Sequence, residues 1–278
     1  MTTTLRPTGP EQRDADGARS RSYDICVNSR PVGLLRLATH ARYGPTTGRV
    51  EQLVVEERER RRGRGAVAAL AAEEVLRDWR CRSVEMSVPA GAQGALKLAG
   101  GLGYRERSRS MLKDLGEAPQ LPEGSSARPM TDEEFPAWRE RGEPKLRRTF
   151  TERGLPDDEV ERAVEESFRK LLPAGAATRG ALLRVLAHEG ADVGTVWIDI
   201  ERSPRTDADS YVYEVEVAED RRGHGHGRSL MLVAERESLA AGARVIGLNV
   251  YTHNTPALRL YSSLGYRPVE HHFFKQLL

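Results

Sequence analysis

Apolar residues along this chain fall into short runs that alternate with helix-length amphipathic segments. Two apolar runs flank a polar turn at 24–37, which predicts a β-hairpin. This hairpin is followed by a strand at 52–55, a glycine-rich turn, a helix from Ala66, a strand at 83–88, a short helix and a last strand. The same order returns from residue 185. The pattern predicts an α/β fold, of the α+β kind with a mixed sheet, in two tandem domains.

The two halves are copies related by a constant shift in residue number. VEERERRRGRG (55–65) and VAEDRRGHGHG (217–227) share the pattern Val, four residues, Arg, two residues, Gly, one residue, Gly, which sets the shift at 162. The same shift aligns the Leu-Gly-Tyr-Arg segments that end at Arg105 and Arg267. About 19 of 63 positions are identical without a gap, so the chain contains an internal duplication.

The copies are predicted to occupy residues 1–116 and 130–278. Residues 117–129 are rich in Pro, Gly and Ser and are expected to be a linker. The second copy has an additional segment at 131–173 whose periodicity predicts two amphipathic helices. The first copy has only about twenty polar residues in that place, too few for two helices.

Composition then narrows the class of protein. Lys plus Arg (43) nearly balances Asp plus Glu (41), so nucleic acid is not an expected partner. Cys26 and Cys81 lie in no CxxC pair or His/Cys cluster, and we expect two buried thiols and no metal. The N-terminal residues lack a signal-peptide pattern and no apolar run reaches 18 residues, which predicts a cytoplasmic protein with no membrane partner. A duplicated unit suits a monomer that is an internal pseudo-dimer, or a homodimer.

The glycine-rich turn suits a phosphate group, because a turn before a helix offers free backbone N–H groups to an anion. The third Gly of the dinucleotide fingerprint and the Gly-Lys-Ser/Thr of a P-loop are both missing, so neither common nucleotide motif fits. Two histidines of the turn are expected to be solubilising loop residues rather than metal ligands. In the second copy the turn comprises Arg222, Gly223, His224, Gly225, His226, Gly227 and Arg228.

The signature that does fit is (Arg/Gln)-x-x-Gly-x-(Gly/Ala), present in both copies in the same relation to a strand valine and a terminal Leu-Gly-Tyr. With Asn254 and Tyr261, these residues closely resemble the GCN5-related N-acetyltransferase (GNAT) superfamily over nearly the whole chain. The resemblance implies acetyl-CoA as cosubstrate and no metal. It implies that residues 222–228 bind the coenzyme pyrophosphate, while the backbone of Val215, Glu216 and Val217 pairs with the pantetheine arm like an added strand.

Acetyl transfer from a thioester to an amine needs a neutral amine, a stabilised oxyanion and a protonated leaving thiolate. Glu214 and Glu216 alternate with valines, so both carboxylates are expected on one strand face, where either can act as base or bind an acceptor ammonium. A merely solvated strand face is the alternative. The resemblance implies that Tyr261 protonates the thiolate, that Asn254 hydrogen-bonds the coenzyme, and that a backbone N–H of 215–217 meets the oxyanion. For Tyr261 the alternative is a packing role.

The first copy lacks every one of these side chains. Two of its glycines remain, so coenzyme binding there stays open, but catalysis is not expected. The aligned pairs are Gln52 with Glu214, Val54 with Glu216, Arg61 with Gly223, Ala92 with Asn254, and Ala99 with Tyr261.

We therefore expect an acetyl-CoA-dependent N-acetyltransferase that modifies a primary amine of a small molecule, with catalysis in the second copy. Phe135, Trp138 and Phe168 are expected to help form the acceptor pocket. The alternatives are a non-catalytic acyl-CoA sensor or interaction module, and an acetyltransferase for a protein lysine or N-terminus. The tandem layout is also similar to that of mycothiol synthases, although no residue here fixes that substrate.

Overall fold

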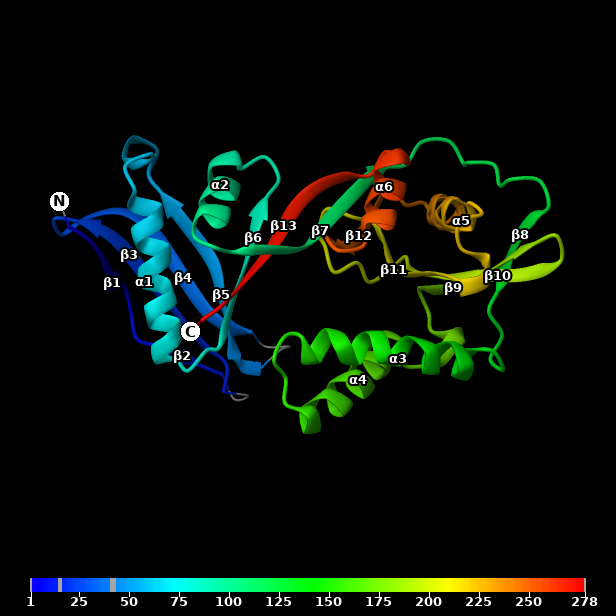
Figure 1. Ribbon diagram of the computed structural model, residues 1–278, viewed down its shortest axis with the longest axis horizontal. Coiled ribbons are helices and arrows are strands. Elements are labelled where there is room, and N and C mark those ends of the chain that lie inside the picture. Colours follow the sequence, from blue (N-terminus) through cyan, green and yellow to red (C-terminus); the bar gives the residue numbers. More distant parts are fainter. Residues whose placement is uncertain (1, 15–16, 41–43, 278) are drawn as a thin grey trace. The chain divides into compact units, whose positions relative to one another are not determined.

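The structure is a computed structural model that describes residues 2–14, 17–40 and 44–277 (Figure 1). The chain packs into two compact units, each assembled from separated segments. Unit 1 comprises residues 1–107, 147–161 and 270–278, and unit 2 comprises residues 108–146 and 162–269. The boundaries predicted from the repeat are linear, whereas the units are discontinuous. Each copy contributes its last strand to the sheet of the other, and residues 147–161 of the second copy belong to unit 1.

Unit 1 contains the first copy of the repeat. Its strands pair antiparallel except for β5 and β6, which are parallel. Where the second copy has two helices before its hairpin, this copy has short strands. In sheet order the strands are β1 (Thr3–Pro7), β3 (Arg19–Val27), β4 (Arg30–His40), β5 (Gly44–Val55), β6 (Ser83–Pro89) and β13 (Arg267–Gln276), with β2 (Gln12–Arg13) beside β3; the helices are η1 (Glu57–Glu59), α1 (Arg64–Asp78) and α2 (Gln93–Gly101).

Unit 2 repeats this plan, with β11 and β12 as the parallel pair. The two predicted helices of the additional segment are α3 (Phe135–Thr151) and α4 (Asp157–Leu171), of which residues 147–161, at the end of α3 and the start of α4, belong to unit 1. In sheet order the strands are β8 (Ser125–Pro129), β9 (Ala181–His188), β10 (Ala191–Asp199), β11 (Ser210–Val217), β12 (Val245–Tyr251) and β7 (Arg105–Asp114); the other helices are η2 (Gly175–Ala177), η3 (Glu219–Arg221), α5 (His226–Ala240) and α6 (Thr255–Ser263).

One part of the expected linker is not a linker. Residues 125–129 form β8, which pairs antiparallel with β9 from Ser125 opposite His188 to Pro129 opposite Arg184. The polar sequence gave no strand periodicity, but an edge strand needs only backbone groups to pair, and its Pro lies at the strand end, where it is tolerated.

Each unit has its own apolar core between the sheet and one long helix. In unit 1 the buried face of α1 presents Ala68, Ala72 and Leu76, spaced four residues apart. Cys26 and Cys81 are free and buried, as predicted, and burial raises the pKa of the Cys81 thiol to about 11. Within the described ranges no helix is long and apolar enough to cross a membrane.

The exchanged strands bring the same ion pair to both units. In unit 1, Lys275 of β13 donates to both carboxylate oxygens of Glu73 of α1 at 2.8 Å. In unit 2, Lys113 of β7 donates to Glu235 of α5 at 2.7 Å. Lys113 and Lys275 are related by the shift of 162, as are Glu73 and Glu235, and both glutamates are at most 3% exposed. Each copy therefore supplies the counter-ion for the buried carboxylate of the other.

Gly194 of β10 lies where the backbone of β11 approaches closely. A Cβ at this position would lie 2.3 Å from the carbonyl oxygen of Glu216 and 3.0 Å from Leu230. We expect Gly194→Ala to lower the free energy of unfolding by about 1–3 kcal/mol, because β11 must move to make room. Urea denaturation measures the loss. As a control, Gly94→Ala in α2, where nothing lies within 4 Å, should be neutral or stabilising; equal losses in the two variants would contradict the assignment.

Candidate functional site

The strand that carries the two candidate glutamates separates from its parallel neighbour halfway along. β11 pairs with β12 only at Ser210, Tyr211 and Val212, while its other edge stays paired with β10 as far as Val217. Among the described residues, no strand pairs with the β12-facing edge beyond Val212. This edge offers unpaired backbone N–H and C=O groups to an extended ligand that carries amides.

A β-bulge accounts for the separation. Trp197 of β10 pairs with Glu214 and Ile198 with Val212, so Tyr213 is an extra residue on β11. A bulge bends its strand and increases the local twist, and it lies where the pairing with β12 ends. The first copy has the same irregularity, with Glu51 as the extra residue. The sequence pattern gave no sign of either bulge.

The glycine turn leads from the end of β11 into α5. Gly223 and Gly225 have φ values of +85° and +87°, in the left-handed region that favours glycine. In the first copy Arg61 replaces Gly223 yet keeps a positive φ of +58°, and Gly63 matches Gly225 at +76°. The turn therefore has the same backbone in both copies, and the N-terminus of a long helix follows it in each.

The side chains around this turn are exposed except for one. Arg222 donates to the carbonyl oxygen of Val217 at 3.3 Å, and Arg228 donates to the Ser263 hydroxyl at 2.7 Å. Gly227 packs against Leu260, where a Cβ would lie at 3.3 Å. Both arginines thus lie beside the helix N-terminus, where an anion would bind.

His226 differs from the expectation for a solubilising loop residue. Its side chain is buried, its ring centre lies 5.1 Å from that of His188, and it is the first residue of α5. Burial lowers its pKa, and the charges of His188, His224 and Arg221 lower it further. His224 is exposed, as expected. No group of three or more His, Cys, Asp and Glu in the described part of the chain could hold a metal ion.

Glu214 and Glu216 project to the same face of β11, as predicted, and they meet a lysine that the sequence did not identify. Lys145 of α3 places its Nζ 2.6 Å from Oε1 of Glu216 and 3.3 Å from Oε1 of Glu214. Arg141, one helical turn earlier, lies 3.9 Å from Glu216. The two carboxylates are 20% and 19% exposed, and burial raises the pKa of Glu214 while Lys145 opposes that rise.

Tyr261 and Asn254 lie at opposite ends of α6. Tyr261 is 9% exposed, and its burial raises the pKa of the phenol to about 12, so the hydroxyl keeps its proton at neutral pH. Asn254 caps the helix, because its side chain accepts a hydrogen bond from the N–H of Ala257 at 3.2 Å. Ala92 occupies the equivalent cap in the first copy with the same backbone angles and no side-chain bond.

The aromatic residues expected at the acceptor pocket pack mainly against one another. Trp138 of α3 is 3% exposed, with ring centres at 5.6 Å from Phe135, 6.4 Å from Phe168 and 5.9 Å from Trp197. Trp197 in turn stacks on Tyr213 at 4.6 Å. This cluster fixes α3 against the bulged part of β11, so the helix that carries Lys145 is held beside the two glutamates.

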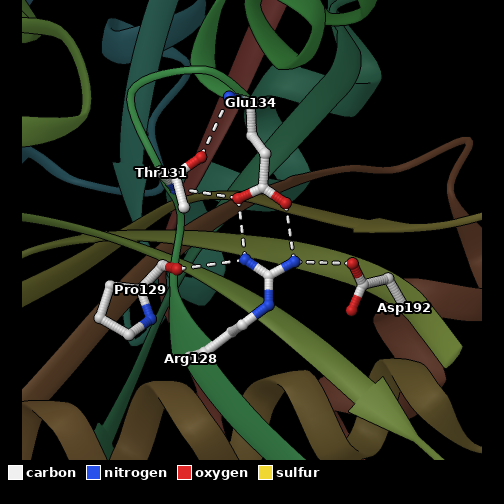
Figure 2. Close-up of polar contacts among 5 residues, drawn as sticks. All are labelled: Arg128, Pro129, Thr131, Glu134 and Asp192. Carbon is white, nitrogen blue, oxygen red and sulfur yellow. Dashed lines mark hydrogen bonds and ion pairs between the residues drawn. The ribbon is translucent and has the colours of Figure 1, made fainter. Parts of the chain in front are cut away.

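A polar cluster anchors the start of α3 (Figure 2). Arg128 of β8 donates through its two terminal nitrogens to both carboxylate oxygens of Glu134, at 2.8 and 2.7 Å, and to Asp192 at 2.7 Å. Thr131 and Glu134 exchange backbone-to-side-chain hydrogen bonds in a capping box. The hydrogen bond from Arg128 is the main reason why the pKa of Glu134 falls to about 2.

These features define a class of α/β protein suited to an extended ligand with a phosphate at one end. The parallel strands separate at a bulge, a left-handed glycine turn follows, and a helix begins beside the gap. The model of the Acetyltransferase (GNAT) family matches residues 3–104 and 135–266. The chain belongs to this family, as the sequence resemblance indicated, and it contains the family unit twice.

Curated and solved proteins agree with this assignment. A mycothiol acetyltransferase from Actinosynnema mirum is 27% identical over 232 residues, which cover 78% of this chain and 71% of that protein. The uncharacterized N-acetyltransferase YycN of Bacillus subtilis is 28% identical over 118 residues, or 42% of this chain and 74% of that protein.

Two solved structures share the fold over most of the chain. A GCN5-related N-acetyltransferase from Sphaerobacter thermophilus has a TM-score of 0.60 at 22% identity, covering 92% of this chain and 80% of its own. A tandem GNAT protein from the clavulanic acid biosynthesis pathway has a TM-score of 0.52 at 23% identity, covering 94% and 84%. The tandem arrangement inferred from the repeat is confirmed.

Proposed function

We propose that the protein transfers an acetyl group from acetyl-CoA to a primary amine of a small molecule, and that unit 2 carries the reaction. The observation that carries this proposal is the pair Glu214 and Glu216, 19–20% exposed on the bulged strand and in contact with an ammonium group. The counterparts of these two residues in unit 1 are Gln52 and Val54, and Ala99 stands at the position of Tyr261.

The residues present fit acetyl-CoA as a cosubstrate. The free edge of β11 beyond Val212 can pair with the amides of a pantetheine arm. The turn at 222–228 and the N-terminus of α5 suit a pyrophosphate. The acetyl thioester would supply the group to be transferred.

The residues of unit 2 can divide the chemistry among them. The Glu214 and Glu216 carboxylates would attract the acceptor as an ammonium ion and accept the proton it must lose before attack. A backbone N–H at 215–217 would donate to the carbonyl oxygen as negative charge develops there. Tyr261, which keeps its proton at neutral pH, would donate it to the leaving sulfur.

The experiment is a steady-state assay of CoA release with acetyl-CoA and a panel of mono- and polyamines, amino sugars and lysine-containing peptides. Turnover of a small amine supports the proposal. Turnover of peptides alone would favour a protein acceptor. Tight acetyl-CoA binding by calorimetry without any turnover would favour the sensor function instead.

Removing the proposed acid should have a moderate effect. We expect Tyr261→Phe to lower kcat about tenfold with little change in KM, because a thiolate, with an ordinary pKa near 8.5, can also leave unprotonated. The phenylalanine keeps the packing against Tyr266, whose ring lies 5.9 Å away. An unchanged kcat would assign Tyr261 to packing alone. Tyr251→Phe, at a partly buried tyrosine of β12, is the matched control.

A further inference from the structure

The side-chain amine of Lys145 in unit 2 lies at the two carboxylates that are proposed to bind the acceptor amine. Its Nζ lies 2.6 Å from Glu216 and 3.3 Å from Glu214, so its ammonium group is bound by both carboxylates. A lysine side chain ends in a primary amine, which is the group that an N-acetyltransferase modifies. An external amine drawn to these carboxylates would meet the same two oxygens.

We propose that Lys145 is a self-acetylation site: unit 2 transfers an acetyl group from acetyl-CoA to the Nζ of its own Lys145. This inference rests on the proposed N-acetyltransferase function. It deepens that function by naming an acceptor within the chain.

The side chain is accessible and able to move. Lys145 is 57% exposed, whereas Glu214 and Glu216 are about 20% exposed. Pro144, immediately before it, lies inside α3 and has no N–H to donate to the preceding turn, which weakens the helix at this point. A flexible four-carbon stem on a weakened helical turn can present its amine along β11 without unfolding the helix.

The step balances with acetyl-CoA as the only co-reactant. Lys145 first loses a proton from Nζ to the carboxylate of Glu216 or Glu214. The nitrogen lone pair forms a bond to the carbonyl carbon, the nitrogen releases its second proton to solvent, and the carbon–sulfur bond breaks. The sulfur takes the electron pair and a proton from Tyr261, which regains a proton from solvent. The products are Nε-acetyllysine at position 145 and free CoA.

The reaction should be faster at higher pH. Burial lowers the pKa of Lys145, but its hydrogen bond to Glu216 and the charge of Glu214 outweigh this and raise the pKa overall. The neutral amine is therefore scarce at pH 7, and its fraction grows as the pH rises toward the pKa of the lysine. Arg141, a second cation near this pair, cannot be an acceptor because its guanidinium stays protonated.

The experiment is peptide mapping by mass spectrometry after incubating the full-length protein with acetyl-CoA and no added amine. The chain has five lysines, and Lys170, exposed on α4, is the internal control for uncatalysed acetylation. We expect Lys145 to be acetylated at least about tenfold faster than Lys170, since its amine is held in the site. The rate constant should be independent of protein concentration, as for a reaction within one chain. It should fall about tenfold or more in Glu214→Gln/Glu216→Gln.

The variant Lys145→Arg is the chemical control. It keeps the positive charge and cannot form the amide, so acetylation at position 145 should disappear while Lys170 keeps its slow uncatalysed rate. Equal acetylation of Lys145 and Lys170 in a wild-type protein that acetylates external amines would overturn the inference and leave the proposed function standing. Selective, first-order acetylation of Lys145 without turnover of any external amine would support the inference and overturn the small-molecule acceptor.

Discussion

Glu214→Gln/Glu216→Gln is expected to lower kcat/KM for an amine acceptor by about 10²–10⁴, the usual contribution of a general base. The amides keep the shape of both side chains but can neither take a proton nor balance the charge of an ammonium ion. Each single variant should lose less, because the remaining carboxylate, also in contact with Lys145, can partly replace the other. The measurement is steady-state kinetics with acetyl-CoA at saturation.

The pH dependence of kcat/KM in the wild-type protein is a second test of Glu214 and Glu216 as the base. Burial raises the pKa of Glu214 above that of an ordinary glutamate. A base works only when deprotonated, so kcat/KM should be retained above this raised pKa and fall as the pH drops through it. The double variant should lack this acid limb. Glu219→Gln, at an exposed glutamate of η3, is the control, and double-variant activity within twofold of that control would remove the glutamates from the mechanism.

Lys113→Met is expected to lower the free energy of unfolding of unit 2 by about 3–5 kcal/mol, because it leaves a buried charge without its partner. Lys113 donates to Glu235 at 2.7 Å, and this glutamate is 3% exposed. Methionine fills nearly the same volume, so the loss would come from the uncompensated carboxylate. Urea denaturation followed by circular dichroism measures it.

Two controls separate this effect from general damage to β7. Lys97→Met, at an exposed lysine of α2, should change stability by less than about 0.5 kcal/mol. The double variant Lys113→Met/Glu235→Leu should recover most of the loss, because an apolar pair can replace a buried ion pair. If the double variant is as unstable as Lys113→Met, the buried charge is not the cause.

The sequence predicted the repeated unit well because its signals are local. The left-handed turn requires Gly225, and the hairpins follow from alternating apolar residues. The shift of 162 follows from comparing the sequence with itself. The predicted face of Glu214 and Glu216 follows from strand alternation. The expectation that His226 is a solubilising loop residue was wrong, because its burial depends on His188, a residue 38 positions earlier.

What the sequence did not predict depends on contacts between distant segments. Lys145 reaches Glu216 across 71 residues, and nothing in the local pattern of α3 points to β11. The bulge at Tyr213 depends on the register with β10, and β8 depends on an available edge of β9. The exchange of the last strands was missed because either copy could, by its pattern alone, have kept its own strand.

The exchange of strands sets the order in which the two units obtain their last strands during synthesis. The first copy leaves the ribosome well before the strand that pairs with β6, because that strand comprises residues 267–276. Unit 2 can recruit β7 as soon as β12 has emerged, since β7 is already available. Unit 1 keeps an open sheet edge until residues 267–276 have been made. A chain that stops short of residue 270 would lack most of β13. The truncation at the C-terminal end would therefore destabilise the sheet built from the first half of the sequence rather than that of the second half.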